Sequence, residues 1–186
     1  EKNGTPREVD ETIEGLLMAA EYNRKNDQKK NSVNAWLVDV IEVYLGKNQS
    51  PKATKNDCLW AFILESADLV TLTHFEEYRK VTGLRCVIPN PSLRIYNILS
   101  QMDESIIPFQ MTSHQFFDDI DTNGPIKTIL DMKNFAQFSI VWLDYCGNFD
   151  SRPGRKRQRD IQVLFGSDKH KGYLASQSIL AVTVSS

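Results

Sequence analysis

Apolar residues in this chain occur in two patterns: short continuous runs, and longer stretches in which they recur every three or four positions. The recurring pattern predicts helices with one buried face, and the continuous runs have the length of strands buried on both faces. The strand-like runs lie at 59–65, 84–88, 105–110, 138–144 and 179–185. Because helical stretches separate them, we predict an α/β fold: a mostly parallel, twisted sheet with helices on both faces.

The first 50 residues show helical spacing only, which predicts an N-terminal helical extension. Thr5 to Glu8 has capping-box spacing, so a first helix is expected there. A second helix is predicted from Ser32 to a C-cap at Gly46. Its apolar face comprises Val33, Trp36, Leu37, Val40, Ile41 and Tyr44. The core is expected to hold all three tryptophans, Trp36, Trp60 and Trp142. We expect a helical cap over 1–56 and a main domain over 57–186, packed as one unit.

Several residues mark where the predicted elements begin and end. Gly83 is expected to end a helix that starts near Asp68, and Ser92 to cap the next one. Asn123-Gly124-Pro125 is expected to separate two further helices. Pro108 lacks an N–H, which predicts that strand 105–110 lies at an edge or a bend of the sheet.

Composition fits an ordinary globular domain. The chain has 186 residues, 41% hydrophobic and 25% charged, with a formal net charge of −2. This balance argues against a whole surface built for nucleic acid, although a local basic patch remains compatible with it. No apolar run approaches the roughly 20 residues of a membrane span, and no secretory signal is visible. The 3 cysteines are widely spaced, without a CxxC pair. Reduced thiols in the nucleus or cytoplasm are therefore expected, without a disulfide framework or a metal site.

Polar residues follow four of the predicted strands. They are Glu65-Ser66-Ala67-Asp68, Pro89-Asn90-Pro91, Met111-Thr112-Ser113 and Asp144-Tyr145-Cys146-Gly147. Each group taken alone also fits an ordinary polar turn. In an open parallel sheet, however, the carboxyl ends of the strands meet at one edge, and ligands bind there. The four groups together therefore predict a binding site.

The order of these elements resembles that of the class I S-adenosylmethionine-dependent methyltransferases, over about 57–186. The clearest stretch is "VWLDYCGNF", which resembles the family's fourth motif, where a polar residue and an aromatic ring close over the methyl-transfer site. "FILESADL" lies where the first motif is expected, "CVIPNP" where the second strand ends beside the ribose, and "QMTSHQFF" where the third approaches the adenine. The resemblance implies a Rossmann-like fold, S-adenosylmethionine as cofactor, and methyl transfer to nucleic acid or protein.

The resemblance also implies roles for individual residues. Asp144 and Tyr145 would be catalytic: the carboxylate as hydrogen-bond or proton acceptor for the nucleophile, the ring as a stacking surface or channel wall. Gly147 would allow a tight turn, and Cys146 is expected to be a packing residue. The cofactor-binding residues implied are Glu65, Ser66, Ala67, Asp68, Asn90, Thr112, Ser113, Asp144 and Gly147.

A basic run, "SRPGRKRQRD", follows directly at 151–160 and is predicted to be a loop. Its cations are Arg152, Arg155, Lys156, Arg157 and Arg159. Three interpretations stay open: solvated surface charge, phosphate contact with a nucleic-acid substrate, or a nuclear-import signal. The three histidines match no metal site or triad, and only His114 falls at a strand end.

The turn after the first strand contains no glycine, although the first motif of the family normally has several. Glycines let the backbone approach a ligand closely. Two further hypotheses therefore remain: a non-catalytic relative of the methyltransferases that contacts RNA or DNA through the basic run, and an α/β domain that binds another nucleotide.

Overall fold

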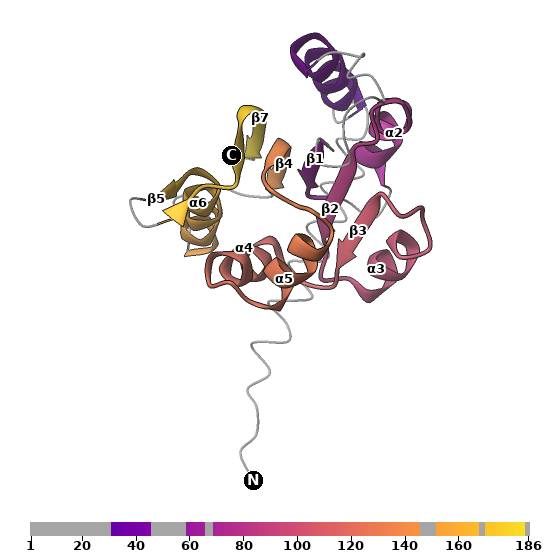
Figure 1. Ribbon diagram of the computed structural model, residues 1–186. Helices are drawn as coiled ribbons and strands as arrows, with labels where there is room; N and C mark the ends of the chain where they lie inside the picture. The colour runs from indigo at the N-terminus through magenta and orange to yellow at the C-terminus, as the bar shows by residue number, and fades with distance from the viewer. Residues whose placement is uncertain (1–30, 46–58, 66–68, 146–151, 168–169, 185–186) are drawn as a thin grey trace.

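The structure, a computed structural model, describes residues 31–45, 59–65, 69–145, 152–167 and 170–184. Five parallel strands form the main sheet, in the order β3-β2-β1-β4-β7 (Figure 1). They are β1 (Trp60–Ile63), β2 (Arg85–Pro89), β3 (Ile106–Phe109), β4 (Phe138–Tyr145) and β7 (Leu174–Val184). All five predicted strands are confirmed, as is the Rossmann-like α/β fold class, although β7 begins at Leu174 rather than at residue 179.

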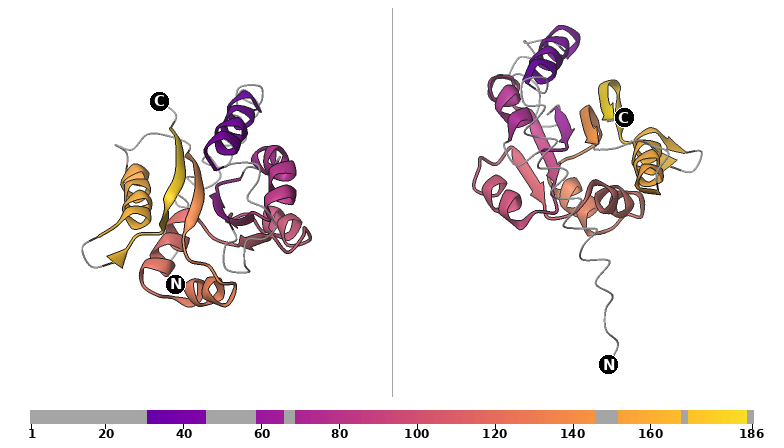
Figure 2. Two further views of the ribbon diagram at one scale, coloured as in Figure 1. Left: turned by 45° about the horizontal axis from the view of Figure 1, so that its top comes forward. Right: turned by 180° about the vertical axis from the view of Figure 1, so that it is seen from behind.

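Helices cover both faces of this sheet, as predicted (Figure 2). One face carries the helix over 31–45, α2 (Val70–Thr82) and α3 (Leu93–Leu99). The other face carries α4 (Ser113–Asp121), α5 (Pro125–Met132) and α6 (Arg152–Phe165). A short antiparallel hairpin, β5 (Gly166–Ser167) with β6 (His170–Lys171), follows α6 and was not predicted. None of the described helices is long and apolar enough to cross a membrane.

Two hydrophobic clusters, one on each face, hold the layers together. The first joins the sheet to α2 and to the helix over 31–45, through residues such as Ile63, Phe75 and Trp142. The second is rich in aromatic rings, and Phe62 lies at its centre with its ring centroid 4.7 Å from that of Phe117. Offset and tilted ring pairs at this spacing add to the hydrophobic contribution of their burial.

The helix over 31–45 confirms the second predicted helix, but its buried face differs from the prediction. Leu37, Ile41 and Leu45 pack in the first cluster, whereas Trp36 is 62% exposed. Neighbouring residues in a helix are about 100° apart, so Trp36 lies well to one side of Leu37. Placing Trp36 in the core was therefore wrong, while Trp60 and Trp142 are buried as expected. The predicted helix near Thr5 lies outside the described residues.

Three predicted element ends, at Gly83, Ser92 and Pro125, agree with the structure, whereas the predicted C-cap at Gly46 lies outside the described residues. Gly83 ends α2 in the left-handed conformation with φ 70°, which glycine adopts without strain. The Ser92 hydroxyl accepts from the Ile95 N–H at the start of α3. Pro125 is the first residue of α5, and the Asp119 carboxylate accepts from the Ile126 N–H at 2.8 Å. These interactions satisfy backbone groups that helix ends leave open.

β3 forms one edge of the sheet, and Pro108 occupies a position that suits an edge. The N–H groups of Cys86 and Asn90 donate to the carbonyls of Ser105 (2.8 Å) and Phe109 (2.9 Å). Odd-numbered residues of β3 therefore direct their backbone groups toward β2. Pro108, an even-numbered residue, faces the open side, where its missing N–H breaks the hydrogen-bonding pattern that a further strand would need.

Candidate functional site at the carboxyl ends of the strands

The strand order reverses between β1 and β4, because β2 and β3 lie on one side of β1 while β4 and β7 lie on the other. In open α/β sheets this reversal opens a crevice at the carboxyl ends of the two strands, and ligands bind there. The structure does not describe residues 66–68 and 146–151, which follow β1 and β4 in the chain. The predicted site residues Ser66, Ala67, Asp68 and Gly147 therefore lie outside the described residues.

Glu65 and Asp144 both lie at the strand ends where the order reverses. Ile63 pairs with Trp142, and the Leu64 N–H donates to the Trp142 carbonyl at 3.1 Å. Side chains alternate along a strand, so Asp144 is on the same face of β4 as Trp142, the face that α2 covers. Two carboxylates at these strand ends favour a cationic group of a ligand.

The Glu65 carboxylate anchors the start of α2. It is buried, and it accepts hydrogen bonds from the N–H groups of Thr71 (3.3 Å) and Leu72 (2.8 Å). These are open donors at the positive end of the helix dipole, so the negative charge is stabilised there. Leu69, just before α2, has a φ of 52°. This turn therefore adopts a left-handed conformation without a glycine at that position, at a cost in strain of about 1 kcal/mol.

Asn90 joins the ends of β1 and β2. Its side-chain amide donates to the Glu65 carbonyl at 3.0 Å, and its side-chain oxygen accepts from the Ser92 N–H at 2.9 Å. The predicted ribose-binding position therefore already holds two segments of backbone. Within the described part of the chain, these two bonds leave one amide hydrogen and one lone pair of this side chain without a partner.

Asp144 is held by the neighbouring strand, because the Thr183 hydroxyl donates to one of its carboxylate oxygens. Two residues earlier on the same face, the indole nitrogen of Trp142 is buried and has no hydrogen-bond partner in the described part of the chain. A buried donor without an acceptor costs about 1–3 kcal/mol. A ligand or water oxygen near Trp142 would offset that cost.

Tyr145 points to the opposite face of the sheet, since side chains alternate along a strand. Its hydroxyl donates to Asp160 of α6 at 2.8 Å. The Ser113 hydroxyl donates to the same carboxylate oxygen at 2.9 Å, and His114 Nδ1 lies 3.3 Å from the other oxygen. We call Ser113, His114, Tyr145 and Asp160 the Asp160 network. It ties β4 and the start of α4 to α6.

Asp160 is 1% exposed, and its titration reflects that burial. Burial raises the pKa of its carboxyl group, while hydrogen bonds from Tyr145, Ser113 and His114 oppose the increase. Burial and the nearby Asp160 charge also raise the pKa of Tyr145. The tyrosine therefore serves as a neutral hydrogen-bond donor at neutral pH.

Thr112 has a structural role at the start of α4. Its hydroxyl accepts from the Gln115 N–H at 3.2 Å, and the Gln115 side chain accepts from the Thr112 N–H at 2.9 Å. This reciprocal pair is a capping box. Of the predicted cofactor-binding residues, Glu65, Asn90 and Asp144 thus lie around the reversal, whereas Thr112 and Ser113 belong to the start of α4.

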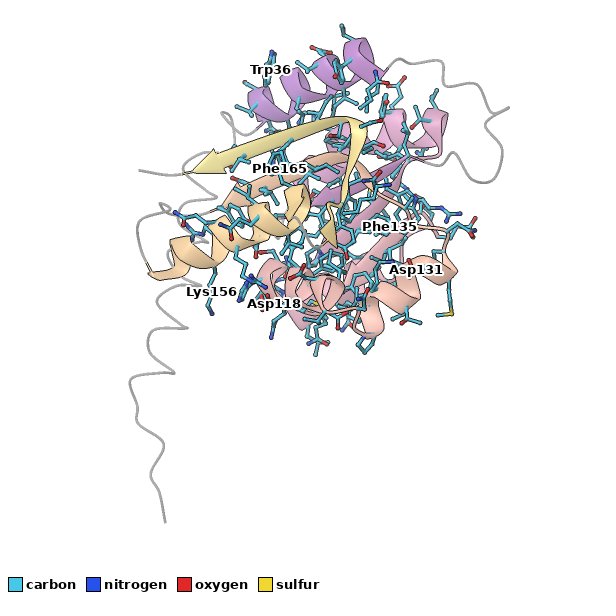
Figure 3. The ribbon with its side chains drawn as sticks, turned by 60° about the vertical axis from the view of Figure 1, so that its left-hand side comes forward. Trp36, Asp118, Asp131, Phe135, Lys156 and Phe165 are labelled. Atoms are coloured by element: carbon cyan, nitrogen blue, oxygen red, sulfur yellow. The ribbon has the colours of Figure 1, made fainter. Side chains whose placement is uncertain are left out.

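The basic run is helical: it forms the first part of α6, so the prediction of a loop was wrong. The many charged residues concealed the helical spacing of Ile161, Val163 and Leu164, which follow the run. Arg157 lies 5.5 Å from the centre of the Tyr145 ring. Arg159 pairs with Asp118 and Asp121, whereas Lys156 is exposed (Figure 3). Only the backbone of Arg152 and Arg155 is described.

Asp160 is the main residue that sequence reasoning missed. It is the one acid in the basic run, and it shares a face with Val163 and Leu164, three and four positions later. Recognising a helix there would have placed a carboxylate on a buried face, which signals a polar partner inside. His114 was noted only for its place after the third strand.

A hollow in the surface lies away from this site. A groove of about 520 Å³ follows the open edge of β3 between α3 and α5. Tyr96, Met102, Pro108, Ile129 and Lys133 are among its lining residues. It contains none of the residues at the reversal between β1 and β4, so we treat it separately.

Within the described residues, no three His, Cys, Asp or Glu side chains converge as a metal site. No protein-family model matches the chain, and no match is found among curated proteins or solved structures.

Proposed function

We propose that this chain is an S-adenosylmethionine-dependent methyltransferase whose cofactor binds at the reversal between β1 and β4. The observation that carries the proposal is the strand order β3-β2-β1-β4-β7, with Glu65 and Asp144 at the strand ends where it reverses. This order is shared by many nucleotide-binding α/β folds, so the chemistry of the side chains has to select the ligand.

The described side chains suit a cationic cofactor. S-adenosylmethionine carries a sulfonium and an ammonium group, and it would supply an activated methyl group. The carboxylates of Glu65 and Asp144 complement those positive charges, and the buried indole N–H of Trp142 can donate to an oxygen of the ligand. Asn90 offers its remaining amide hydrogen to a ribose hydroxyl.

Methyl transfer requires alignment more than acid or base strength, because the methyl group moves in line between two atoms. Asp144 is suited to orient the acceptor and to take its proton, since its carboxylate lies near the carboxyl end of β4 and the Thr183 hydroxyl holds it in place. Tyr145 serves the site indirectly: its hydrogen bond to Asp160 positions the end of β4 against α6. Its predicted direct role in catalysis stays a prediction.

Nucleic acid is the substrate class that we favour. α6 is the next described element after β4 in the chain, and its first part carries the basic run. Lys156 is exposed there and suits contact with a phosphate group. A protein substrate remains the alternative.

A non-catalytic relative is the second candidate function, and two observations favour it. The side chains of Glu65 and Asn90 already bind the backbone, and residues 65–68 contain no glycine. Such a domain would keep the fold and the basic helix but would not bind the cofactor.

Isothermal titration with S-adenosylmethionine and S-adenosylhomocysteine separates the two candidates. We expect both ligands to bind. Asp144→Asn should weaken the binding of S-adenosylmethionine by about tenfold, or about 1.4 kcal/mol. The affinity for S-adenosylhomocysteine should fall less, because its sulfur carries no charge. Asp131→Asn, an equivalent substitution on the surface of α5, is the control. Absence of binding heat together with an unchanged melting temperature would refute the methyltransferase proposal and favour the non-catalytic relative.

A further inference from the structure

The two edges of the sheet differ in how they resist the addition of another strand. Pro108 interrupts the open side of β3, as described above. β7, at the opposite edge, is 11 residues long, and it contains neither proline nor a charged residue. Edge strands that lack prolines, charges and a covering element pair readily with other strands. We propose that β7 pairs antiparallel with β7 of a second copy, so that the chain forms a two-fold symmetric dimer with one continuous sheet.

The direction of the backbone groups identifies which residues of β7 would bind the partner. Because the Leu64 N–H donates to the Trp142 carbonyl, Trp142 and Asp144 direct their backbone groups toward β1. Leu143 therefore faces β7, where it pairs with Val182. In a parallel ladder, the backbone of Leu143 hydrogen-bonds to the residues on either side of Val182, which are Ala181 and Thr183. The N–H and C=O of Val182 then point to the open edge.

When two identical strands pair antiparallel, the side chains of one copy lie opposite those of the other copy in reverse order. No charged residue occurs from Gly172 to Ser186, so no like charges would face each other across an antiparallel pair. Like charges placed opposite one another destabilise such pairs. A two-fold axis perpendicular to the sheet also places the same face of both copies on the same side.

An apolar stripe with two exposed aromatic side chains, Trp36 and Tyr44, and half-buried Val40 lies on the helix over 31–45. Asn31 of this helix contacts His74 of α2 at 3.1 Å, so that side of the helix faces α2. Trp36, Val40 and Tyr44 lie on the opposite side of the helix, given about 100° per residue. The helix reaches β7 as well, because the Gln177 side chain donates to the Tyr44 carbonyl at 3.3 Å. The stripe therefore faces the open edge of β7.

The face behind β7 also carries an exposed aromatic residue, Phe165, at the end of α6 (Figure 3). In the proposed dimer, Trp36 and Tyr44 of the two copies meet above the joined sheet. The α6 helices approach each other on the other face. Burial of large aromatic side chains contributes strongly to interface stability, which supports a second copy as the occupant of this edge.

Sedimentation equilibrium over a wide range of concentration tests the proposal. The 21.3 kDa chain should sediment at twice that mass. Val182→Pro removes the outward N–H and reproduces on β7 what Pro108 does on β3. Val182→Lys introduces a charge into the paired edge of both copies. Each should raise the dissociation constant of the dimer by about ten- to a hundredfold, because a two-fold interface loses every contact twice.

Val81→Lys, on the exposed side of α2, is the matched control and should leave the dimer intact. Trp36→Ser probes the helical stripe without altering the strand, and it should also weaken the dimer. Circular dichroism verifies that each variant folds. If Val182→Pro does not fold, Val182→Lys and Trp36→Ser decide the question. A wild-type monomer at every concentration, or a dimer that both of these variants leave unchanged, would overturn the proposal.

Discussion

The hydroxyl of Tyr145 donates a hydrogen bond of 2.8 Å to the carboxylate of Asp160, and this bond joins the end of β4 to the middle of α6. Ser113 adds a donor from α4, so one buried carboxylate connects three elements beside the proposed site. Low polarity strengthens these bonds, and it also makes the loss of any of them costly.

Tyr145→Phe should lower the free energy of unfolding by about 1–2 kcal/mol, because Asp160 stays buried and loses one donor. Ser113→Ala should have a similar effect. The double variant should differ from the sum of the two by about 0.5–1 kcal/mol, since both hydroxyls bind one oxygen atom. Urea denaturation of the four proteins measures this coupling. Strict additivity would show that the two hydroxyls act independently.

The raised pKa of Asp160 predicts a specific pH dependence of stability. The folded state holds this proton more tightly than the unfolded chain, in which the carboxyl group has its ordinary pKa of 3.8. The contribution of Asp160 is therefore most favourable at low pH and declines as the pH rises above about 4. Asp160→Asn should remove that decline. Denaturation curves between pH 4 and pH 8 measure it, with Asp39→Asn on the exposed side of the helix over 31–45 as the control.

Asp103 should stabilise the fold in the opposite pH direction. Hydrogen bonds from Arg79 and Ser105 lower its pKa to about 2, and the Arg79 guanidinium lies 2.6 Å from both of its oxygens. Its stabilisation is complete above the unfolded pKa of 3.8 and is lost as the pH falls toward 2. Asp103→Asn should make the free energy of unfolding less dependent on pH in this range. It should also cost about 1–3 kcal/mol at neutral pH, because it leaves buried Arg79 without its anion.

Glu76→Gln provides the comparison for Asp103. Glu76 also pairs with a cation, Lys80, but both of these side chains are more than half exposed. Ion pairs of this kind contribute little. The midpoint of urea denaturation should therefore barely move. A shift as large as that of Asp103→Asn would mean that burial of Arg79 is not what makes its ion pair important.

Nucleic-acid binding should depend on Lys156 more than on Arg159, because two carboxylates of α4 already pair with Arg159. Lys156→Ala should flatten the log–log salt dependence of binding to single strands by about 0.7, and Arg159→Ala should change it less. Fluorescence anisotropy with a labelled oligonucleotide at several salt concentrations measures both slopes. A slope for Lys156→Ala equal to that of the unmodified protein would indicate that α6 does not contact phosphate through Lys156.

The sequence was sufficient for the sheet because each strand is a continuous apolar run between recognisable turns. Pro108 even indicated an edge, and the structure places it there. The contacts among the strand ends were not predictable, since they depend on which side chains the register brings together. Glu65 and Asp144 come to the same edge of the sheet only because β1 pairs with β4, which lies far along the chain. Tyr145, the next residue after Asp144, instead faces Asp160. The many charged residues of the basic run concealed the helix that carries Asp160.

The position of β1 at the centre of the sheet has a consequence during synthesis on the ribosome. β1, β2 and β3 follow one another in the chain, so their pairs can form early. The other side of β1 must wait for β4: Ala61 pairs with Ile140. Until β4 is made, an apolar strand, Trp60–Ile63, has one unpaired edge. Long-range pairs form slowly, and unpaired apolar strands aggregate. A nascent chain stalled between β3 and β4 should therefore be a strong target for chaperones, although the finished domain buries this strand completely.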